Sequence, residues 1–403
     1  QANTMFDRDF IVLELANILA GPVTGMFFAE LGARVIKLEN PHTGGDTTRG
    51  WKLASEPADT DISAYFSCAN WGKESLACDF TTAAGREVAH ALAQKADIVI
   101  ASFKPGDEVK LKLDYETLRA LNPALIYGQI SAYGPDDPRP GFDAILQAEA
   151  GFTFLNGEPD GPPTKMPVAL IDLLLAHQLK EGLLLALLKR ERGGTGALVS
   201  TSLFEAGVAS LANQATNFLV GDTVPQRMGS EHPNIVPYGT ILTCEDGREL
   251  VIAAATEKQY RMLMGALGLS DIADEAHFST GQNRVKHREA LLTAIRARAA
   301  MVPAERLAAD LEAAKVPFGF VNDMAAVFDL PGGQRLQMKA EAQDRELTGV
   351  RSFSAESTAF PRRPVSAPPS LHQHGTEILR ELLGYPTELI EKLKTEGAFG
   401  QIE

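Results

Sequence analysis

Strand-like and helical segments alternate over the first forty residues of the chain. Phe10–Leu15 (FIVLEL) is a short apolar run typical of a buried strand, and Val35–Glu39 (VIKLE) is a second such run. Between them the pattern predicts a helix that begins at Pro22, which has no N–H to lose at a first helical position, and that ends at Gly32. A strand, a helix and another strand in so short a stretch form a βαβ unit, which implies a parallel sheet.

The same alternation continues to about residue 220. We expect helices at Thr82–Ala96, Tyr115–Leu121, Met166–Arg192 and Phe204–Leu219, and strands at Asp97–Ala101, Leu125–Ile130 and Ala197–Leu203. Gly193-Gly194 ends the longest of these helices. The pattern predicts an α/β fold in which residues 1–220 form a doubly wound, Rossmann-like large domain. Gln1–Thr4, ahead of Met5, are left out of this assignment.

The amino-acid composition of the chain changes beyond residue 220. Gly221–Pro237 is rich in Gly, Pro and polar residues, which indicates a linker or a functional loop. Asp246-Gly247 between two apolar runs predicts a β-hairpin. With helices expected at Glu257–Leu267, Lys286–Ala300 and Pro303–Ala314, residues 225–320 form a small α+β domain. A strand-like stretch at 341–358 and helices at 376–383 and 387–395 indicate that residues 325–403 complete the large domain.

Composition narrows the choice of partners and location. The chain has 403 residues, enough for two domains, and a net charge of −14. That charge argues against nucleic acid or an anionic membrane as a partner, because either requires a basic surface. Cys68, Cys78 and Cys244 show no disulfide pattern, and no signal peptide or long apolar run is present, so we expect a cytoplasmic protein. Without a CxxC or HExxH motif we expect no metal site.

The longest predicted helix carries a carboxylate on its apolar face. Helical steps from Asp172 reach an apolar stripe formed by Leu175, Ala176, Leu179, Leu183 and Ala186. One interpretation is a residue of the first helical turn whose charge is satisfied by backbone N–H groups. The other is a partly desolvated carboxylate that serves as a nucleophile. The helix alone does not decide between them.

A nicotinamide enzyme is a competing interpretation of the first half. Glu39 ends the second strand, where such an enzyme keeps the acidic residue that binds ribose. However, the first turn is Ala20-Gly21-Pro22 and lacks the GxGxxG glycines that let pyrophosphate approach the backbone. This absence disfavours a dinucleotide site.

Several short motifs follow one another along nearly the whole chain. They are Ala20-Gly21-Pro22, Gly32–Lys37, Gly45-Asp46 before Arg49-Gly50-Trp51, Ala96–Ile100 before Phe103–Gly106, Gly141-Phe142-Asp143 with Gln147, Gly161–Thr164 before Asp172, Leu187-Leu188, Thr195-Gly196, Val199–Leu203, and Ala367-Pro368-Pro369 before His374. Each is weak alone, but in this order and spacing they resemble the class III CoA-transferases, the CaiB/BaiF family.

The resemblance implies an activity and a role for Asp172. An enzyme of this family moves CoA from an acyl-CoA thioester to a carboxylic acid, and the aspartate at this position becomes an aspartyl-CoA thioester. Coenzyme A is then a substrate and no cofactor is permanently bound. The resemblance also implies that residues 225–320 act as a lid and that two copies form an intertwined homodimer. The block His232–Tyr238 is similar to members that use C4–C6 dicarboxylates, for example with succinyl-CoA as the donor.

Two alternatives remain within this fold. A racemase branch acts on 2-methylacyl-CoA and carries histidine at the position of Phe142, but phenylalanine cannot transfer a proton. A catalytically idle CoA-binding protein is the other alternative, and the intact Asp172 argues against it.

The resemblance also points to contact residues. The CoA contacts that it implies are Ile18, Leu19, Asn40, Cys78, Asp79, Ser102, Phe103 and Lys110. Phe103 would stack on adenine, and Lys73, Lys104 or Lys110 would meet phosphates. This chain departs from some relatives, which carry arginine at the position of Asn40, asparagine at Ser102 and a polar amide at Leu19.

For the acid substrate, the resemblance places Phe142 and His232 near the site. His232 either contacts a distal carboxylate or caps the backbone of its own loop, and that loop lacks the glycine run found in some relatives. Arg49, Arg227 and Lys165 are candidates to pair with a second carboxylate. His372 and His374 lie in the closing motif, and the sequence assigns neither a role.

Overall fold

The chain divides into two compact units. The computed structural model describes residues 5–401, so Gln1–Thr4 and the last two residues lie outside the described residues. The first unit takes in the chain up to Ala150, Pro167–Leu211 and the chain from Arg335 onward. The second takes in Gly151–Met166 and Ala212–Gln334.

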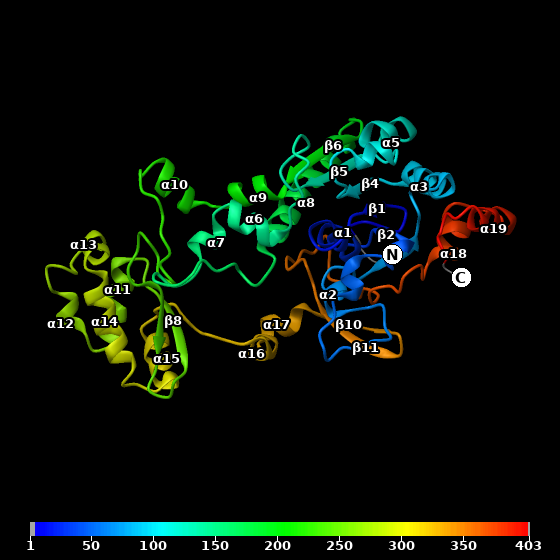
Figure 1. Cartoon of the computed structure of the whole chain (residues 1–403). Helices are drawn as coiled ribbons and strands as arrows, with labels where there is room; N and C mark the ends of the chain where they lie inside the picture. The colour runs from blue at the N-terminus through cyan, green and yellow to red at the C-terminus, as the bar shows by residue number, and fades with distance from the viewer. Residues whose placement is uncertain (1–4, 402–403) are drawn as a thin grey trace. The chain divides into compact units, whose positions relative to one another are not determined.

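A six-stranded parallel sheet forms the centre of the first unit (Figure 1). Its strands stand in the order β3-β2-β1-β4-β5-β6, so the order reverses between β1 and β4. The strands are β1 (Ile11–Leu15), β2 (Arg34–Glu39), β3 (Lys73–Ala77), β4 (Ile98–Ala101), β5 (Ile126–Ser131) and β6 (Ala197–Ser202). The predicted α/β fold with a parallel sheet is therefore confirmed, and smaller antiparallel sheets accompany it.

One strand of this sheet was not predicted. β3 reads KESLA, and three polar residues in five conceal a strand that is buried along its whole length. Each polar side chain has a partner inside the protein: Lys73 bonds Glu14, Glu74 bonds Arg34 and Ser75 bonds Glu39. Burial of these groups is tolerated because every one is paired.

Helices cover both faces of the sheet. α1 (Ala20–Glu30), α8 (Leu170–Glu191) and α9 (Leu203–Ala209) pack together on one face, and α3 (Ala83–Lys95) packs with α5 (Tyr115–Leu121) on the other. The remaining helices of this unit are η1 (Pro41–Thr43), η2 (Thr47–Gly50), α2 (Ala64–Ser67), α4 (Asp107–Lys110), α6 (Asp143–Glu149), α18 (Gly375–Glu377), η3 (Ile378–Leu382) and α19 (Thr387–Thr395).

Two helix predictions were wrong in detail. Pro22 is the third residue of α1 rather than the first, and it is still within the turn whose N–H groups need no helical partner. The single helix expected at Phe204–Leu219 is broken, because Ala212 has a φ of 50° between α9 and α10 (Asn213–Leu219). The apolar stripe predicted on α8 is buried as expected.

The second unit has its own sheet and core. β7 (Tyr238–Thr243) and β8 (Glu249–Ala253) form the predicted hairpin, with Gly247 at a φ of 79°, and β9 (Phe318–Phe320) completes an antiparallel sheet. The helices are α7 (Phe152–Leu155), α10, α11 (Glu257–Ala266), α12 (Ser270–Ala273), α13 (Gly281–Lys286), α14 (Arg288–Ala299), α15 (Ala304–Ala313) and α16 (Met324–Asp329), and α17 (Pro331–Leu336) crosses into the first unit. An apolar core that includes Leu250, Ile252, Leu263 and Leu291 joins sheet and helices.

The strand-like stretch expected at 341–358 proved to be a hairpin that starts earlier. β10 (Gln337–Ala342) pairs with β11 (Arg345–Val350) across a two-residue turn. Both turn residues, Gln343 and Asp344, have positive φ values of 52° and 57°. Such turns favour Asn-Gly or Asp-Gly, so the Gln-Asp pair left no clear signal in the sequence.

The C-terminal segment covers the outer edge of the sheet at β3. Figure 1 shows this segment, in red, beside the strands near the N terminus. The Ser75 N–H donates to His374 Nδ1 at 3.2 Å, and the Ala77 N–H donates to His372 Nδ1 at 3.1 Å. The His374 N–H donates in turn to the Ser75 carbonyl. The two imidazoles thus replace the hydrogen bonds that a further strand would supply.

We expect this edge contact to make stability depend on pH. Burial lowers the pKa of both His372 and His374 below the ordinary value of 6.5. As the pH falls through 6.5, the unfolded chain takes up protons that the folded chain refuses, so stability falls. The charged groups around the pair are Lys394 beside His372, and Glu74, Glu377, Arg34 and Arg8 beside His374.

The measurement is the melting temperature of the protein between pH 8 and pH 5. A double variant, His372→Asn with His374→Asn, keeps an acceptor but cannot titrate, so its melting temperature should fall less over this range. The exposed His277→Asn serves as the matched control and should behave as wild type. Equal pH dependence in all three proteins would contradict the role of the pair.

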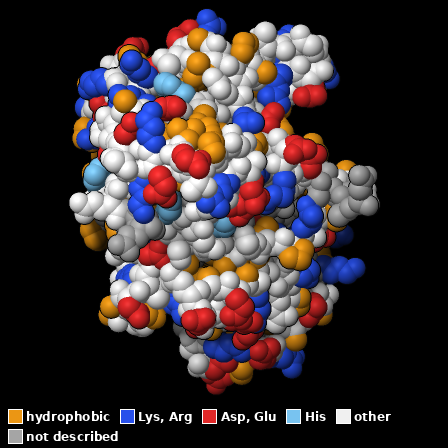
Figure 2. Space-filling model, turned by 90° about the vertical axis from the view of Figure 1, so that its right-hand side faces the viewer, with side chains coloured by type: hydrophobic (Ala, Val, Ile, Leu, Met, Phe, Trp, Pro, Cys, Tyr) orange, Lys and Arg blue, Asp and Glu red, His pale blue; other side chains and the backbone are white. Residues whose placement is uncertain are grey.

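The surface carries charges of both signs. On the face in Figure 2, Lys and Arg side chains are interspersed with Asp and Glu. None of the helices that the structure describes is long and apolar enough to cross a membrane.

Candidate active site

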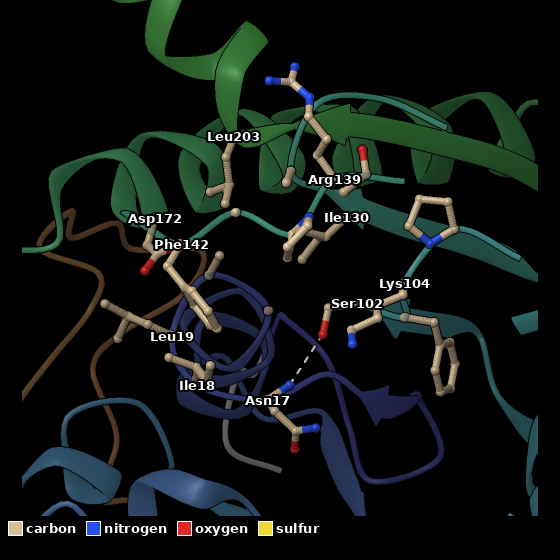
Figure 3. Close-up of a pocket in the computed structure, with 18 of the residues that line it drawn as sticks. Asn17, Ile18, Leu19, Ser102, Lys104, Ile130, Arg139, Phe142, Asp172 and Leu203 are labelled. Atoms are coloured by element: carbon tan, nitrogen blue, oxygen red, sulfur yellow. Dashed lines mark hydrogen bonds between the residues drawn. The ribbon is translucent and has the colours of Figure 1, made fainter. Parts of the chain in front are cut away.

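A pocket lies at the carboxyl ends of β1 and β4, where the strand order reverses. It is lined by the turn after β1 (Asn17–Gly21), by Ser102–Pro105 after β4, by Pro138–Phe142, and by Asp172 (Figure 3). In α/β sheets this point of reversal is the general place for ligands, because the loops on either side diverge. All of these residues belong to the first unit.

Asp172 reaches the pocket from the first turn of α8. Among the residues that the structure describes, none forms a hydrogen bond to its carboxylate, and the helix has no side-chain cap of its own. The Ile171 N–H donates instead to Asp143 Oδ1 at 2.8 Å. The interpretation of Asp172 as a carboxylate satisfied by backbone N–H groups is therefore wrong.

The surroundings of Asp172 raise the pKa of its carboxyl group above the value of an aspartate in water. Burial, followed by the nearby charge of Asp143, raises the pKa of Asp172 from 3.8 to about 7. Asp143 itself is buried and accepts from Gln147 Nε2 at 2.7 Å as well as from Ile171. A carboxylate with few partners is a better nucleophile than one surrounded by donors, provided that it is ionised.

We expect the acid limb of the pH–rate profile to report this carboxylate. If Asp172 must be ionised to react, kcat/KM should rise with pH below about 7 and level off above it. Asp143→Asn removes the second charge, so the pKa of Asp172 should fall and the limb should move to lower pH. The rate at pH 6 relative to pH 8 should then rise several-fold.

The control for this profile is Glu181→Gln, an exposed acidic residue further along the same helix. It should leave the limb in place. A limb that stays near 7 in Asp143→Asn, or moves upward, would show that Asp143 does not act on Asp172 through its charge.

The Phe142 ring forms one wall beside Asp172. Phe142 precedes α6, and its ring extends from beside Asp172 toward Ile18 and Leu19 (Figure 3). The ring is 60% exposed, which makes it an apolar surface for a ligand. It offers no proton for acid–base chemistry at this wall.

A second hollow adjoins the first at the same edge of the sheet. Its lining includes Asn40, Cys78 and Asp79, and it shares Asn17, Ser102 and Phe103 with the pocket of Asp172. The structure thus brings together seven of the eight residues proposed to contact CoA, with Ile18 and Leu19 in the first hollow. The carboxylate of Asp79 already bonds His42 Nε2 at 2.7 Å, and buried Cys78 donates its thiol to the Gly85 carbonyl.

Lys110 is the exception among the eight. Its ammonium is exposed and pairs with Asp107 at 2.8 Å, and it lines neither hollow. Lys73, another candidate for phosphate, is fully buried against Glu14, so that assignment was wrong. Lys104 does line the pocket, together with Arg139. Arg139 was not predicted, because it lies within a loop that has no regular pattern.

His232 belongs to the second unit. Its Nδ1 accepts the Asn234 N–H at 3.1 Å, which is the backbone cap considered as one of its two roles. Its ring packs edge-on against Tyr238. Arg227 of the same unit donates to the Phe154 carbonyl.

Arg49 and Glu39 form a buried ion pair with each other. Arg49 Nη2 and Nε bond the two Glu39 oxygens at 2.7 and 2.8 Å, and both side chains are buried. Arg49 is therefore not free to hold a substrate carboxylate, and that candidate was wrong. Glu39 is likewise not free to bind the ribose of a nicotinamide cofactor. Among the described residues, no three His, Cys, Asp or Glu side chains converge as metal ligands do.

Comparison with known proteins gives consistent matches. The model of CoA-transferase family III matches residues 8–375. A succinate–glutarate CoA-transferase of Agrobacterium fabrum is 36% identical over 95% of this chain and 96% of its own length. A succinyl-CoA:mesaconate CoA-transferase of Haloarcula marismortui is 34% identical over 93% and 95%. The crystal structure of a CaiB/BaiF family protein from Brucella suis is similar with a TM-score of 0.81, at 37% identity over 94% of this chain and all of that one.

Proposed function

The chain belongs to CoA-transferase family III, and from this premise we propose that it exchanges CoA between dicarboxylic acids through a thioester on Asp172. The observation that carries the proposal is a carboxylate to which no residue between 5 and 401 donates a hydrogen bond, in a pocket at the point where the strand order reverses. The donor we favour is succinyl-CoA and the acceptor a C4–C6 dicarboxylate, because the named relatives act on succinate, glutarate and mesaconate.

The exchange consists of four acyl transfers. An oxygen of Asp172 attacks the donor thioester carbon, the C–S bond breaks, and CoA thiolate leaves a mixed aspartyl-acyl anhydride. The thiolate attacks the aspartyl carbon and expels the donor carboxylate, which leaves an aspartyl-CoA thioester. The acceptor carboxylate then attacks this carbon and releases the thiolate. The thiolate attacks the acceptor carbonyl and frees Asp172. No proton is gained or lost, so no general base is required.

The residues around Asp172 suit these steps. The Phe142 ring and the apolar side chains of Ile18 and Leu19 keep water away from an anhydride and a thioester, which water would hydrolyse. Lys104 offers positive charge to the anionic ligand, whereas the Arg139 guanidinium already pairs with Asp137 at 2.8 Å. The adjoining hollow, with Phe103 packed edge-on against Phe80, would take the nucleotide end of CoA.

Further parts of the proposal concern the whole molecule. The strand order is the order of Rossmann folds, which supports a Rossmann-like CoA-binding domain within residues 1–220 and 325–403. Of these ranges, Gly151–Met166, residues 212–220 and residues 325–334 belong to the second unit instead. We propose residues 225–320 as a lid domain, as the family resemblance implies. Cys68, Cys78 and Cys244 are all unpaired, which supports a reducing compartment such as the cytoplasm. We propose the intertwined homodimer on the family resemblance alone.

The experiment is a screen of acyl-CoA donors against carboxylic acids, with the CoA products resolved by chromatography. Exchange between succinyl-CoA and a dicarboxylate, with monocarboxylates much slower, would support the proposal. No exchange with any pair would favour an idle CoA-binding protein instead.

A further inference from the structure

The turn that faces Asp172 holds a strained residue. Residues 16–19 join β1 to α1, and Ile18 and Leu19 line the pocket across from Asp172 (Figure 3). Ile18 has a φ of 74°, in the left-handed region that a β-branched residue rarely enters. Such a conformation persists only where the surrounding structure imposes it.

Hydrogen bonds at three successive residues of the turn impose this conformation. The Ile18 N–H donates to both oxygens of Asp46, at 3.3 and 3.1 Å. The Ala16 carbonyl accepts from Lys37 Nζ at 2.7 Å, and the Asn17 N–H donates to Ser102 Oγ at 3.3 Å. The turn is thus fixed at three successive residues by side chains from β2, from the loop after it and from the end of β4.

The first two anchors belong to a buried cluster of four charges. Lys37 Nζ lies 2.9 Å from Glu14 Oε1 and 3.0 Å from Asp46 Oδ2, and Lys73 Nζ lies 2.7 Å from Glu14 Oε2. The charges of Glu14, Asp46, Lys37 and Lys73 cancel, and all four side chains are fully buried. Gly25 of α1 leaves room for Glu14, because a Cβ there would overlap Oε2.

The same cluster also forms a hydrogen bond to the first turn of α1. Lys73 Nζ donates to the Pro22 carbonyl at 2.8 Å, on the helical side of the turn. Buried ion pairs add little net stability compared with apolar side chains of similar size. What this cluster does supply is fixed donors and acceptors on both sides of a strained turn at the pocket.

We propose that Asp46 is a positioning residue, which sets the conformation of Ile18 and Leu19 against the thioester that reacts with Asp172. This inference rests on the proposed function. Asp46 touches no ligand in this arrangement, since it is buried beneath the turn and acts through the Ile18 N–H. Thr48 holds the carboxylate in place, with Oγ1 donating to Asp46 Oδ1 at 2.8 Å.

The test is a double-mutant cycle on the rate of thioester formation at Asp172 in a single turnover. Asp46→Asn should slow this step about tenfold, the scale of one strained residue, with little change in the KM of the acceptor acid. Glycine adopts a positive φ without strain. In the Ile18→Gly background, Asp46→Asn should therefore cost less than about threefold. Equal factors in the two backgrounds would overturn the proposal.

Two further variants separate positioning from loss of stability. Thr48→Val loosens the Asp46 carboxylate without removing its charge, and it should slow the same step about twofold, so the test survives if Asp46→Asn folds poorly. Glu30→Gln alters a buried carboxylate at the end of α1, which bonds Ser352 rather than the turn, and should destabilise the protein without slowing the step. A rate that follows stability through all these variants would contradict the proposal.

The outcome also separates this inference from the proposed function. If wild-type protein forms no thioester at Asp172, the proposed function fails. If wild type forms it and Asp46→Asn forms it at the same rate, only the positioning role fails.

Discussion

Replacing Asp172 by alanine is expected to lower the rate of CoA exchange by about 10⁴-fold or more, with the fold unchanged. The loss should be this large because, in the proposed mechanism, the side chain is the covalent carrier in every step, and removal of such a nucleophile leaves only binding and positioning. Since no hydrogen bond holds its carboxylate in the described part of the chain, its removal should not destabilise α8. The measurement is steady-state exchange between succinyl-CoA and glutarate, with circular dichroism to check the fold.

The matched control is Asp271→Ala. Asp271 also lies in the first turn of a helix, α12, but it is exposed and belongs to the second unit. Asp271 is not among the residues that line the pocket of Asp172, so this variant should exchange CoA at the wild-type rate. Activity of Asp172→Ala within tenfold of this control would rule out the aspartyl mechanism.

Replacing Lys37 by methionine is expected to destabilise the first unit by about 3–5 kcal/mol, because a buried charge is left without its partner. Burial alone would lower the pKa of Lys37, but the carboxylates of Glu14, Asp46 and Glu39 outweigh it and raise the pKa. The Lys37 ammonium in turn helps hold the pKa of Asp46 at about 2 despite burial. Both groups are therefore charged in the folded wild-type protein at neutral pH. Lys37→Met leaves the buried cluster with one excess negative charge, and protonating Asp46 to remove that charge costs free energy.

Tryptophan fluorescence during urea unfolding suits this measurement, because Trp51 and Trp71 both lie in the first unit. Adding Asp46→Asn to Lys37→Met restores neutrality and should recover part of the lost stability. The exposed Lys339→Met, which breaks a surface pair with Glu346, should change little. A loss of less than about 1 kcal/mol in the free energy of unfolding of Lys37→Met would show that Lys37 does not neutralise buried carboxylates in this cluster.

The parts of the fold that could be predicted are those with strong periodicity. β1, α1 and β2 follow directly from apolar runs separated by a helical stretch, and the hairpin of the second unit follows from Asp246-Gly247. β3 could not be predicted, because its polar side chains are paired with groups distant in sequence. The break at Ala212 has no local signal either, since the residues around it are compatible with a helix.

The candidate site shows the same division. Asp172 stands out in the sequence because it places a carboxylate on the apolar stripe of a helix. Asp143 does not stand out, because its effect on Asp172 depends on α6 and α8 meeting in space. The ion pair of Glu14 and Lys37 could have been predicted. Each is a charged residue within a strand predicted to be buried, and neighbouring buried charges of opposite sign should pair.

The most direct test is to trap the intermediate. Wild-type protein is incubated with succinyl-CoA alone, quenched with hydroxylamine or borohydride, digested and analysed by mass spectrometry. We predict a hydroxamate or a reduced side chain at Asp172, and none when acid without acyl-CoA is used. A modification at another residue, or exchange at full rate with Asp172 never labelled, would contradict the account.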